Sequence, residues 1–436
     1  MTRITLNLQN FSQKDALMQI FEKYTNDFEY TSDEIFRRVV PPVCSCGTRM
    51  NHNGYNTYCK KDLGSVKIGR YECPLCKETY EEKRSFWEEI KEEFFSLMNK
   101  LYQRMRSLHV SYEGISDIMD FIFPRGKDTI YNSFNSSVEN TKIPPIKDVR
   151  IVHYDEQYPK EGRTQKYRLT LLDHVTGQPI ADELYDSKDS TTIKEFLDKH
   201  LDPNQQIFVV TDIANGYPSI FKDFFGKNVI HQLCLLHLNK LIIKDFPKRT
   251  TMEQELTKYK LLNIFYNRDN EIEFLKKLAE EEKIMKQKND KGYLKWLKKQ
   301  RYLFKRFLHD LELRRRREKQ NLEQRSYEEA FDILDDLMKE FYSFSTSLRK
   351  RLDMIKKNWK YLTAFYFVEG APATNNLLEN YYSTSLKTHR KKQLRKDKGI
   401  ENHIKLSAMK RAGMLKKPEK TLLEVFLKFI PFLNPG

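Results

Sequence analysis

The sequence predicts a mixed α/β domain that is interrupted by a long all-α insertion and preceded by a cysteine-rich module and a helical domain. Three observations lead to this prediction. Five of the six cysteines fall between Cys44 and Cys76, β-like runs around a helix occupy residues 149–210, and residues 239–370 are helical and very basic. A chain of 436 residues has room for about three such structural units.

The composition predicts a folded protein with a polyanionic partner. Lys and Arg outnumber Asp and Glu by 77 to 61, a net charge of +16, so nucleic acid is the first partner to test. A hydrophobic content of 39% is too high for a disordered basic tail. No apolar run reaches the roughly 18 residues of a membrane span, and the N-terminus has no apolar signal core. We therefore expect a soluble cytoplasmic protein with reduced cysteines and no membrane partner.

The first 147 residues are predicted to contain three parts. Residues 1–40 form short helices, residues 41–82 form a small hairpin-rich module, and residues 83–147 are helical. Within the helical part, short helices at 111–122 and 128–138 are joined by a turn that contains Pro and Gly. This spacing is that of a DNA-binding helix-turn-helix, although plain helix packing accounts for it equally well.

The cysteines of the module at 41–82 have the spacing of zinc ligands. A Cys-x-x-Cys turn brings Cys73 and Cys76 to one tetrahedral ion, and the pair Cys44 and Cys46 completes a four-sulfur site. The first pair is separated by one residue instead of two, so one of its members can be idle. The possible substitutes are Cys59 and His52. We expect a zinc ribbon that unfolds without its metal, with a redox or accidental cluster as the alternative.

Strands are predicted to begin after the Pro-containing linker at 141–145. The β-like runs are 149–154, 167–172, 180–185 and 207–210. A tight turn at 173–177 joins the second run to the third, and a helix at 191–201 precedes the fourth. Three hairpin-like strands, a helix and then a fully apolar strand describe a mixed α/β sheet.

Two acidic residues end predicted strands. Asp155 follows the first run and Asp212 follows the apolar run, and ligands of open α/β sheets gather at the carboxyl ends of strands. If these strands are parallel neighbours, the two carboxylates face each other and repel unless a divalent cation lies between them. An Asp at a strand end is more often a helix cap or a turn residue. Three nearby acids compete with the first position: Glu156, Asp173 and Asp182.

Further motifs accompany these acids. His231-Gln232-x-Cys234-x-x-His237 follows the second Asp, and Thr374-Asn375-Asn376-x-x-Glu379 lies near the end of the chain. Together with Val210-Thr211-Asp212 and Tyr217, they resemble the DDE transposases of prokaryotic insertion sequences, especially those related to eukaryotic Mutator-like elements. The resemblance covers about residues 148–415, and its Cys-x-x-His motif is more specific than any single acid. A zinc ribbon and a helix-turn-helix upstream also suit this family.

The resemblance implies an RNase H-like fold that is divided by a helical insertion. Its first part is expected at 148–238, the insertion at 239–370, the second part with the catalytic helix at 371–415, and a C-terminal tail at 416–436. The interval between Asp212 and Glu379 is long enough to contain the insertion.

The resemblance also implies the roles of individual residues. The expected ligands of two catalytic Mg²⁺ or Mn²⁺ ions are Asp155, Asp212 and Glu379. Cys234 and His237 match the family's motif, and their spacing places them on one helical face, where they either shape the site or pack beneath it. Asn376 is expected to support the site. If Asn376 is the N-cap of its helix, Glu379 instead completes a capping interaction.

Basic runs are predicted to face the DNA backbone. One lies in the insertion and the other, at 387–398, directly follows the expected catalytic helix. The residues expected to bind DNA are Arg314, Arg315, Arg316, Arg317, Lys387, Arg390, Lys391, Lys392 and Arg395. A solvated helix face is the alternative for the insertion run. Trp296 and Trp359 are candidates for stacking on an unpaired base, although core packing is the more common role.

The implied reaction is cleavage at the ends of an insertion sequence, followed by attack of the freed 3′-OH groups on target DNA. Its partners are terminal inverted repeats and target DNA, at least a dimer is expected because two ends must be paired, and the DNA-bound protein is expected at the nucleoid. Two alternatives remain: a catalytically inactive zinc and helix-turn-helix DNA-binding regulator, and an RNase H-like nuclease. A tyrosine or serine recombinase is disfavoured because no matching basic constellation accompanies a nucleophile.

Overall fold

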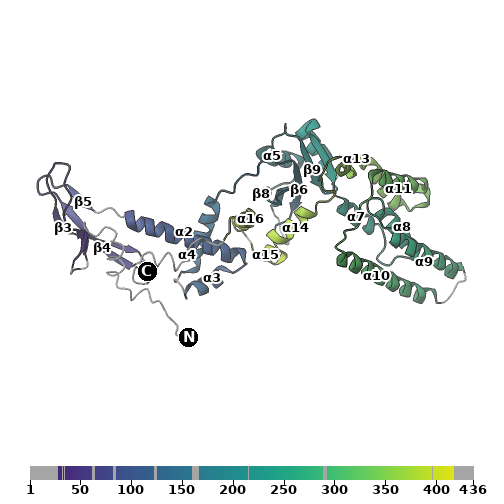
Figure 1. Cartoon of the computed structure of the whole chain (residues 1–436), viewed down its shortest axis with the longest axis horizontal. Helices are drawn as coiled ribbons and strands as arrows, with labels where there is room; N and C mark the ends of the chain where they lie inside the picture. Colours follow the sequence, from purple (N-terminus) through teal and green to yellow (C-terminus); the bar gives the residue numbers. More distant parts are fainter. Residues whose placement is uncertain are drawn as a thin grey trace. The chain divides into compact units, whose positions relative to one another are not determined.

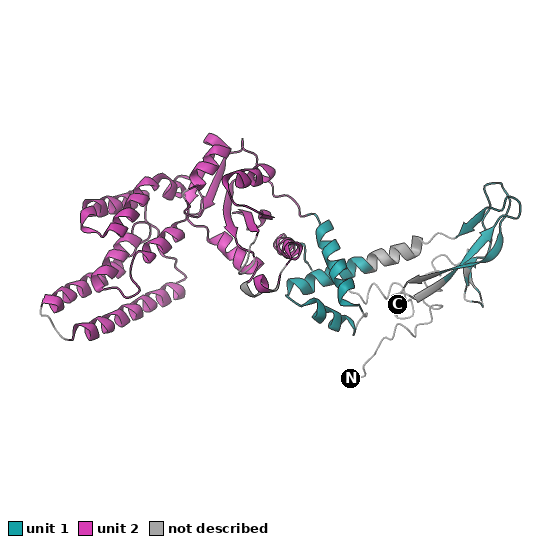
Figure 2. Ribbon diagram, turned by 180° about the vertical axis from the view of Figure 1, so that it is seen from behind, with its two compact units in different colours: residues 1–142, 413–436 teal, residues 143–412 magenta. Residues whose placement is uncertain are grey.

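The computed structural model describes residues 28–31, 33, 35–60, 64–81, 85–121, 125–159, 166–214, 216–287, 292–394 and 396–416. The chain divides into two compact units, residues 1–142 with 413–436 and residues 143–412 (Figure 2). Within the described ranges, no helix combines the length and the apolar character needed to cross a lipid bilayer.

The first unit contains a small five-stranded sheet with the order β1-β2-β4-β3, in which β5 also pairs with β4. The strands are β1 (Phe28–Tyr30), β2 (Ile35–Arg38), β3 (Asn51–Lys60), β4 (Gly64–Glu72) and β5 (Thr79–Glu81). The prediction of short helices in 1–40 is therefore wrong for residues 28–38, and residues 1–27 lie outside the described part. Strand β1 pairs with β2, where Glu29 binds Arg37 at 2.6 Å, and β2 extends the sheet beside β4. The helical periodicity of the sequence gave no indication that these segments pair as strands.

The same unit contains three helices, α2 (Ser85–Ser107), α3 (Tyr112–Met119) and α4 (Lys127–Asn140). The two short helices predicted around the Pro-Gly turn are confirmed as helices. Ser111 caps α3 by accepting a hydrogen bond from Gly114 N at 3.0 Å. The guanidinium of Arg106 lies 4.0 Å from the centre of the Tyr112 ring and 5.8 Å from that of Phe134, which ties the three helices together.

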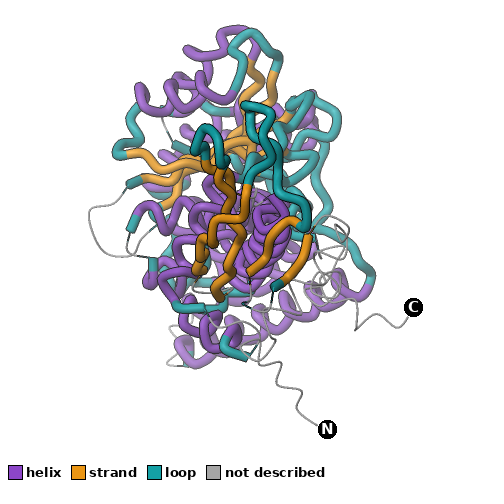
Figure 3. The backbone as a smooth tube through the Cα atoms, turned by 90° about the vertical axis from the view of Figure 1, so that its left-hand side faces the viewer, coloured by secondary structure: helices purple, strands orange, loops and turns teal. Residues whose placement is uncertain are grey.

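The second unit is built on a mixed five-stranded sheet with the order β10-β9-β6-β7-β8 (Figure 1; strands are orange in Figure 3). The strands are β6 (Ile151–Gln157), β7 (Tyr167–Asp173), β8 (Pro179–Tyr185), β9 (Ile207–Thr211) and β10 (Val229–Leu233). Strands β6, β9 and β10 are parallel, whereas β7 pairs antiparallel with β6 and β8 pairs antiparallel with β7. The mixed sheet and its four predicted strands are confirmed; β10 was not predicted.

Helices cover both faces of this sheet. On one face, Val152, Tyr154 and Val209 pack against Phe196 of α5 (Ser190–His200) and Phe221 of α6 (Tyr217–Phe225). Side chains alternate along a strand, so the residues between these point to the other face. There, strands β9 and β10 share a continuous core with helices of the insertion, through Phe208, Val210, Leu233, Leu238, Leu334 and Leu352.

The predicted helical insertion is confirmed as helical. It contains α7 (Leu235–Lys244), α8 (Met252–Leu262), α9 (Asp269–Gln287), α10 (Tyr293–Arg317), α11 (Tyr327–Lys339), α12 (Thr346–Lys357) and α13 (Trp359–Leu362). The chain then returns to the sheet through α14 (Asn376–Ser385), α15 (Thr388–Gln393) and α16 (Asp397–Arg411). Leu378, Tyr381 and Tyr382 of α14 pack on Leu172 of β7, and α14 also contacts β6.

Candidate functional site

The parallel register of three strands brings candidate site residues to one edge of the sheet. His153 of β6 pairs with Val210 of β9, so two residues further along the same register Asp155 lies beside Asp212. On the other side of β9, the backbone N–H of Cys234 donates to Thr211 O at 2.8 Å. Asp212 and Cys234 therefore directly follow the carboxyl ends of β9 and β10, and Asp155 lies beside them inside β6. The prediction that Asp155 ends its strand is wrong, because β6 continues to Gln157 alongside β7.

The carboxylate of Asp155 is in an unfavourable environment for a charge. Burial, followed by the nearby charge of Asp212, raises the pKa of Asp155 well above its usual range. Its Oδ1 accepts a hydrogen bond from the backbone N–H of Glu156 at 2.8 Å, and Tyr382 donates to its carbonyl oxygen at 2.7 Å. Two carboxylates held this closely are stabilised by a cation placed between them.

The other acids near the start of the sheet already have partners. Glu156 accepts hydrogen bonds from the hydroxyls of Tyr154 and Tyr217. Asp173 accepts from the N–H and the hydroxyl of Thr176, both at 2.7 Å, in the turn between β7 and β8. Asp182 forms a buried ion pair with Arg168 at 2.6 Å. Of these acids, Asp155 has the position best suited to act with Asp212.

Glu379 comes to this edge from α14, whose start is fixed by a buried asparagine. Asn375, with no exposed surface, is the N-cap of α14, and its side chain does not cap the helix. Its amide N–H₂ donates to Tyr154 O at 3.1 Å and its Oδ1 lies 2.8 Å from His153 Nδ1, while its backbone N–H donates to Cys234 Sγ at 3.1 Å. The alternative of a capping pair between Asn376 and Glu379 is therefore wrong. The motif contained Asn375, but its sequence context gave no sign of these distant partners.

Two basic side chains of α7 contact the acids. His237 Nδ1 lies 2.9 Å from Asp212 Oδ1, and its Nε2 lies 3.5 Å from Glu379 Oε1. Lys240 Nζ lies 2.7 Å from the same glutamate oxygen. The Asp212 carboxylate and the Cys234 thiol raise the pKa of His237 to about 10, so the ring is protonated at neutral pH. His237 thus links two of the acids that the sequence singled out.

Lys240 was missed in the sequence. It follows His237 by three residues, so helical spacing places both side chains on the same face of α7. Glu379 is the main reason that the pKa of Lys240 is raised. The three-residue spacing from His237 could therefore have pointed to Lys240. By itself, a single lysine in a chain with 77 Lys and Arg residues does not stand out.

The residues at this edge fit a divalent cation. Donor atoms of Asp212, Cys234 and His237 all lie within 4.8 Å of one another. Asp212 Oδ1 and His237 Nδ1 are buried, and despite their close approach neither makes a well-formed hydrogen bond among the described residues. Carboxylate oxygens are the ligands preferred by Mg²⁺ and Mn²⁺. Asp155, Asp212 and Glu379 carry carboxylates, and in this structure His237 pairs with Asp212 and Lys240 pairs with Glu379.

A buried ion pair anchors α14 to the sheet. Arg168 on β7 has no exposed surface and binds Asp182 on β8 through two hydrogen bonds, at 2.7 and 2.6 Å. Its guanidinium also donates to the Ser385 hydroxyl at 2.8 Å. The guanidinium lies 5.2 Å from the centre of the Tyr381 ring and 4.9 Å from that of Tyr382, which is within the range of cation–π contacts. The helix that carries Glu379 is therefore fixed at its C-terminal half as well as at its start.

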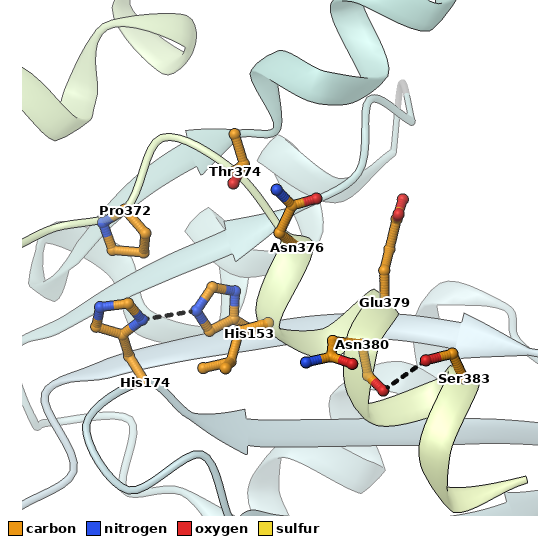
Figure 4. A pocket seen from close by; sticks show the side chains of 9 residues that line it. His153, His174, Pro372, Thr374, Asn376, Glu379, Asn380 and Ser383 are labelled. Atoms are coloured by element: carbon orange, nitrogen blue, oxygen red, sulfur yellow. Dashed lines mark hydrogen bonds between the residues drawn. The ribbon is translucent and has the colours of Figure 1, made fainter. Parts of the chain in front are cut away.

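A pocket of about 670 Å³ lies beside Glu379 (Figure 4). His153 and His174 form one wall, and the exposed face of α14 forms the other. His153 Nε2 lies 3.0 Å from His174 Nδ1. Burial lowers the pKa of His153 to about 4 and also lowers that of His174, so both rings are neutral at pH 7. Because the Asn375 amide N–H₂ is used on Tyr154, its oxygen accepts from His153 Nδ1–H, and His153 Nε2 then accepts from His174 Nδ1–H.

The four cysteines of the first unit form a cluster that can hold a metal ion. The Sγ atoms of Cys44 and Cys76 are 3.4 Å apart, those of Cys46 and Cys73 are 3.5 Å apart, and all four lie within 4.8 Å of one another. This four-sulfur arrangement is compatible with structural zinc. Cys44 and Cys46, although separated by one residue instead of two, both belong to this cluster. Gly47, at a φ of 83°, turns the chain behind them.

The sequence offered two possible substitute ligands for this cluster, His52 and Cys59. His52 is placed against the ring of Tyr71, with 5.1 Å between ring centres, and is not among the clustered ligands. The side chain of Cys59 lies outside the described residues.

The predicted DNA-binding residues differ in their exposure. Arg314 and Arg317 are exposed, and Arg316 is exposed and pairs with Glu312, whereas Arg315 binds the buried Glu271 at 3.2 Å. In the second run, Lys387 and Lys392 are exposed, Lys391 donates to Tyr158 O at 2.9 Å, and Arg390 is buried. Arg395 lies outside the described residues. Arg315 and Arg390 therefore have structural positions.

The two tryptophans pack within the insertion. Trp359 stacks on Phe265 with 5.5 Å between ring centres and donates to the Tyr327 hydroxyl at 3.3 Å. Trp296 packs beside Tyr293 against the core around Met252. Core packing thus describes both side chains in this structure.

Comparison with known proteins agrees with the residue-level resemblance at a coarse level. No model of a known protein family matches the chain. The chain is 26% identical over 259 residues, 55% of its length, to a protein of Methanobrevibacter smithii named as an uncharacterized 48.3 kDa protein of the insertion element ISM1. The matched region spans 58% of that relative. This similarity supports an origin in an insertion sequence.

Proposed function

We propose that this chain is a metal-dependent DNA transposase. The observation that carries the proposal is that Asp155 of β6 lies beside Asp212, while His237 contacts both Asp212, at 2.9 Å, and Glu379 of α14, at 3.5 Å. Asp212 Oδ1 and His237 Nδ1 are buried there without a well-formed hydrogen bond among the described residues. The similarity to an insertion-element protein and the net charge of +16 support a DNA substrate.

The proposed chemistry is cleavage of the element's ends and transfer of the freed 3′-OH to target DNA. Two Mg²⁺ or Mn²⁺ ions would supply activation of the attacking oxygen and stabilisation of the leaving oxygen. Asp155 and Asp212 would hold these ions from the sheet, and Glu379 would hold them from α14. His237 and Lys240 keep the acids charge-balanced before the ions bind, and His237 orients the Asp212 carboxylate. No side chain acts as a covalent nucleophile.

The finer architectural assignments belong to the same proposal. We assign the mixed sheet with its helical insertion to the RNase H-like fold, the four-cysteine module to the zinc ribbons, and α3 and α4 to a helix-turn-helix. The strand order β10-β9-β6-β7-β8 and the position of the acids support the first assignment. Terminal inverted repeats would be the DNA ligand of the first unit, and pairing of two ends requires at least a dimer.

The decisive test is Asp212→Asn, with Asp223→Asn as the matched control. Asp223 is an exposed acid on α6 that pairs with Lys194 at 3.0 Å. With DNA that carries the element's ends and Mg²⁺, we expect Asp212→Asn to reduce cleavage and strand transfer by more than about 100-fold, because the variant lacks a metal ligand. DNA affinity should stay within about twofold of wild type, because phosphate contacts dominate it. The control should retain both activities.

Simultaneous loss of cleavage and DNA binding in Asp212→Asn would instead give Asp212 a structural role. Cleavage without end joining by the wild-type chain would favour the nuclease.

The second candidate function is a DNA-binding regulator without catalytic activity. The observation that favours it is that His237 and Lys240 already balance the charges of Asp212 and Glu379. In that case, the wild-type chain would bind DNA with no cation-dependent cleavage, and Mn²⁺ would not bind to the second unit.

A further inference from the structure

The pocket beside Glu379 differs in chemistry from the exposed basic residues of α10 and of the 387–398 run. Apart from Glu379, its walls carry neutral polar groups and apolar surface, and its described lining residues include no Lys or Arg. They are His153, His174, Pro372, Thr374, Asn376, Leu377, Glu379, Asn380 and Ser383. Lys240 and His237, which balance the charge of Glu379, are not among them, so the lining itself offers a phosphate group no cationic side chain. The pocket therefore suits a neutral part of a ligand.

Several lining groups have hydrogen-bonding capacity to spare. The side chains of Thr374, Asn376 and Asn380 make no hydrogen bond with any other described residue. His174 uses Nδ1 on His153, which leaves its Nε2 for a ligand. Each asparagine amide offers both a donor and an acceptor in one plane. The volume of about 670 Å³ lies within the usual range of small-ligand sites.

The chemistry of the lining suits a flat ligand with polar edges. Figure 4 shows the His174 ring and Pro372 at one end, with Asn376, Asn380 and Ser383 presented by α14 along the other side. Rings and apolar side chains such as Leu377 offer surface for a planar group to pack on, while the amides can read its edge. A nucleobase has this combination of a planar apolar face and neutral donors and acceptors.

We propose that this pocket binds an unstacked nucleobase of the DNA strand, next to the phosphate that is cleaved. This inference rests on the proposed function, because Glu379 lines the pocket and is also a proposed metal ligand. The pocket then supplies base recognition at the cleavage position, while exposed lysines and arginines supply contacts to the backbone.

The test measures binding without chemistry. The probes are two single-stranded DNA heptamers that differ only at the central position, which carries either 2-aminopurine or an abasic site. Fluorescence anisotropy with the full chain, in buffer without added divalent cations, should show about 10-fold tighter binding of the heptamer with the base. Its 2-aminopurine emission should also change on binding, because the base leaves its stacked neighbours.

Two serines provide a matched pair of variants. Ser383 Oγ donates to Asn380 O at 2.9 Å in the pocket, and Ser219 Oγ donates to Gly216 O at 2.8 Å at the start of α6; both are exposed. Ser383→Trp should fill the pocket and remove the preference for the base, whereas Ser219→Trp should keep it. The double variant Asn376→Leu/Asn380→Leu keeps the number and branching of the side-chain heavy atoms and should weaken the preference for the base at least fivefold. It tests the pocket independently of the tryptophan variant, should that variant misfold.

The outcomes separate this inference from the proposed function. Equal affinity for the two heptamers, or an undiminished preference in both pocket variants, would overturn the nucleobase site. Failure of the proposed function would appear elsewhere, as absence of cation-dependent cleavage by the wild-type chain, and would leave the heptamer measurement unchanged.

Discussion

Single residues around Asp212 carry charges that respond to pH. The folded-state pKa of His237, about 10, lies above its ordinary value of 6.5. Protonated His237 therefore stabilises the metal-free fold fully below pH 6.5, and this contribution disappears as the pH rises towards 10. The same proton competes with a cation for Asp212, since both positive charges use one carboxylate.

This charge pair gives a prediction for the histidine itself. In the metal-free chain, NMR of the labelled imidazole should show His237 still protonated at pH 8, and Asp212→Asn should bring its pKa down towards 6.5 because the main cause of the shift is removed. His174, whose pKa is lowered by burial, serves as the internal reference and should not follow the change. A wild-type midpoint for His237 near 6.5 would contradict the ion pair.

At the scale of elements, the placement of α14 depends on the buried ion pair between Arg168 and Asp182. Arg168→Met removes one partner of the buried pair with Asp182 and leaves an uncompensated carboxylate among Tyr381 and Tyr382. We expect a loss of about 3–5 kcal/mol in the free energy of unfolding of the second unit. Denaturant titration followed by circular dichroism measures it.

The control for this prediction is an exposed pair of the same kind. Lys194→Met breaks the ion pair with Asp223 on the surface and should change the free energy of unfolding by less than about 1 kcal/mol, because exposed pairs are screened by solvent. Similar losses in both variants would show that the burial of Arg168 has no special weight.

The four-cysteine module should depend on its metal in the same local way. Removal of the ion with a chelator is expected to unfold β3 and β4, because so small a module has only a minor core around Cys44, Met50, Tyr71 and Cys73. Hydrogen exchange should then accelerate in residues 41–81 and stay unchanged in β6 and β9. Zinc added back should restore protection, and full protection in the presence of chelator would exclude a structural metal.

The strands of the second unit differ in how well the sequence predicted them. Strands β6, β7 and β9 were predictable because apolar runs and the turn at 173–177 are local signals. Strand β10 was not, since His231 and Gln232 interrupt its apolar character. Both are buried: His231 Nε2 lies 2.8 Å from the Thr211 hydroxyl, while Gln232 donates to Leu362 O and accepts from the Phe365 N–H. Asp212 and Glu379 were singled out through their motifs, and Asp155 through its predicted strand position and the family resemblance. The contacts of Lys240 and Asn375, and the pocket, are created only by the fold.

At the scale of the whole molecule, the charge of +16 predicts that binding to DNA, as proposed above, depends on the salt concentration. Arg314 and Arg317 are exposed at the end of α10, so Arg314→Gln/Arg317→Gln should reduce the slope of log affinity against log salt by about 0.9 for each phosphate that the variant no longer neutralises. Fluorescence anisotropy over a salt series measures this slope.

The matched control removes the same charge elsewhere. Lys222 and Lys227 are exposed on and just after α6, and Lys222→Gln/Lys227→Gln should leave the slope unchanged. Equal changes in the two double variants would mean that the net charge of the chain, rather than the end of α10, sets the salt dependence.

The core that β9 and β10 share with the insertion has a bearing on how the protein is made. Val210 and Leu233 are covered by residues synthesised much later, such as Leu334 and Leu352, and Glu379 leaves the ribosome later still. On the proposed chemistry, a nascent or prematurely terminated chain that stops within the insertion carries two acids and an uncovered sheet. On that chemistry, cleavage of DNA would require a chain that extends at least through Glu379.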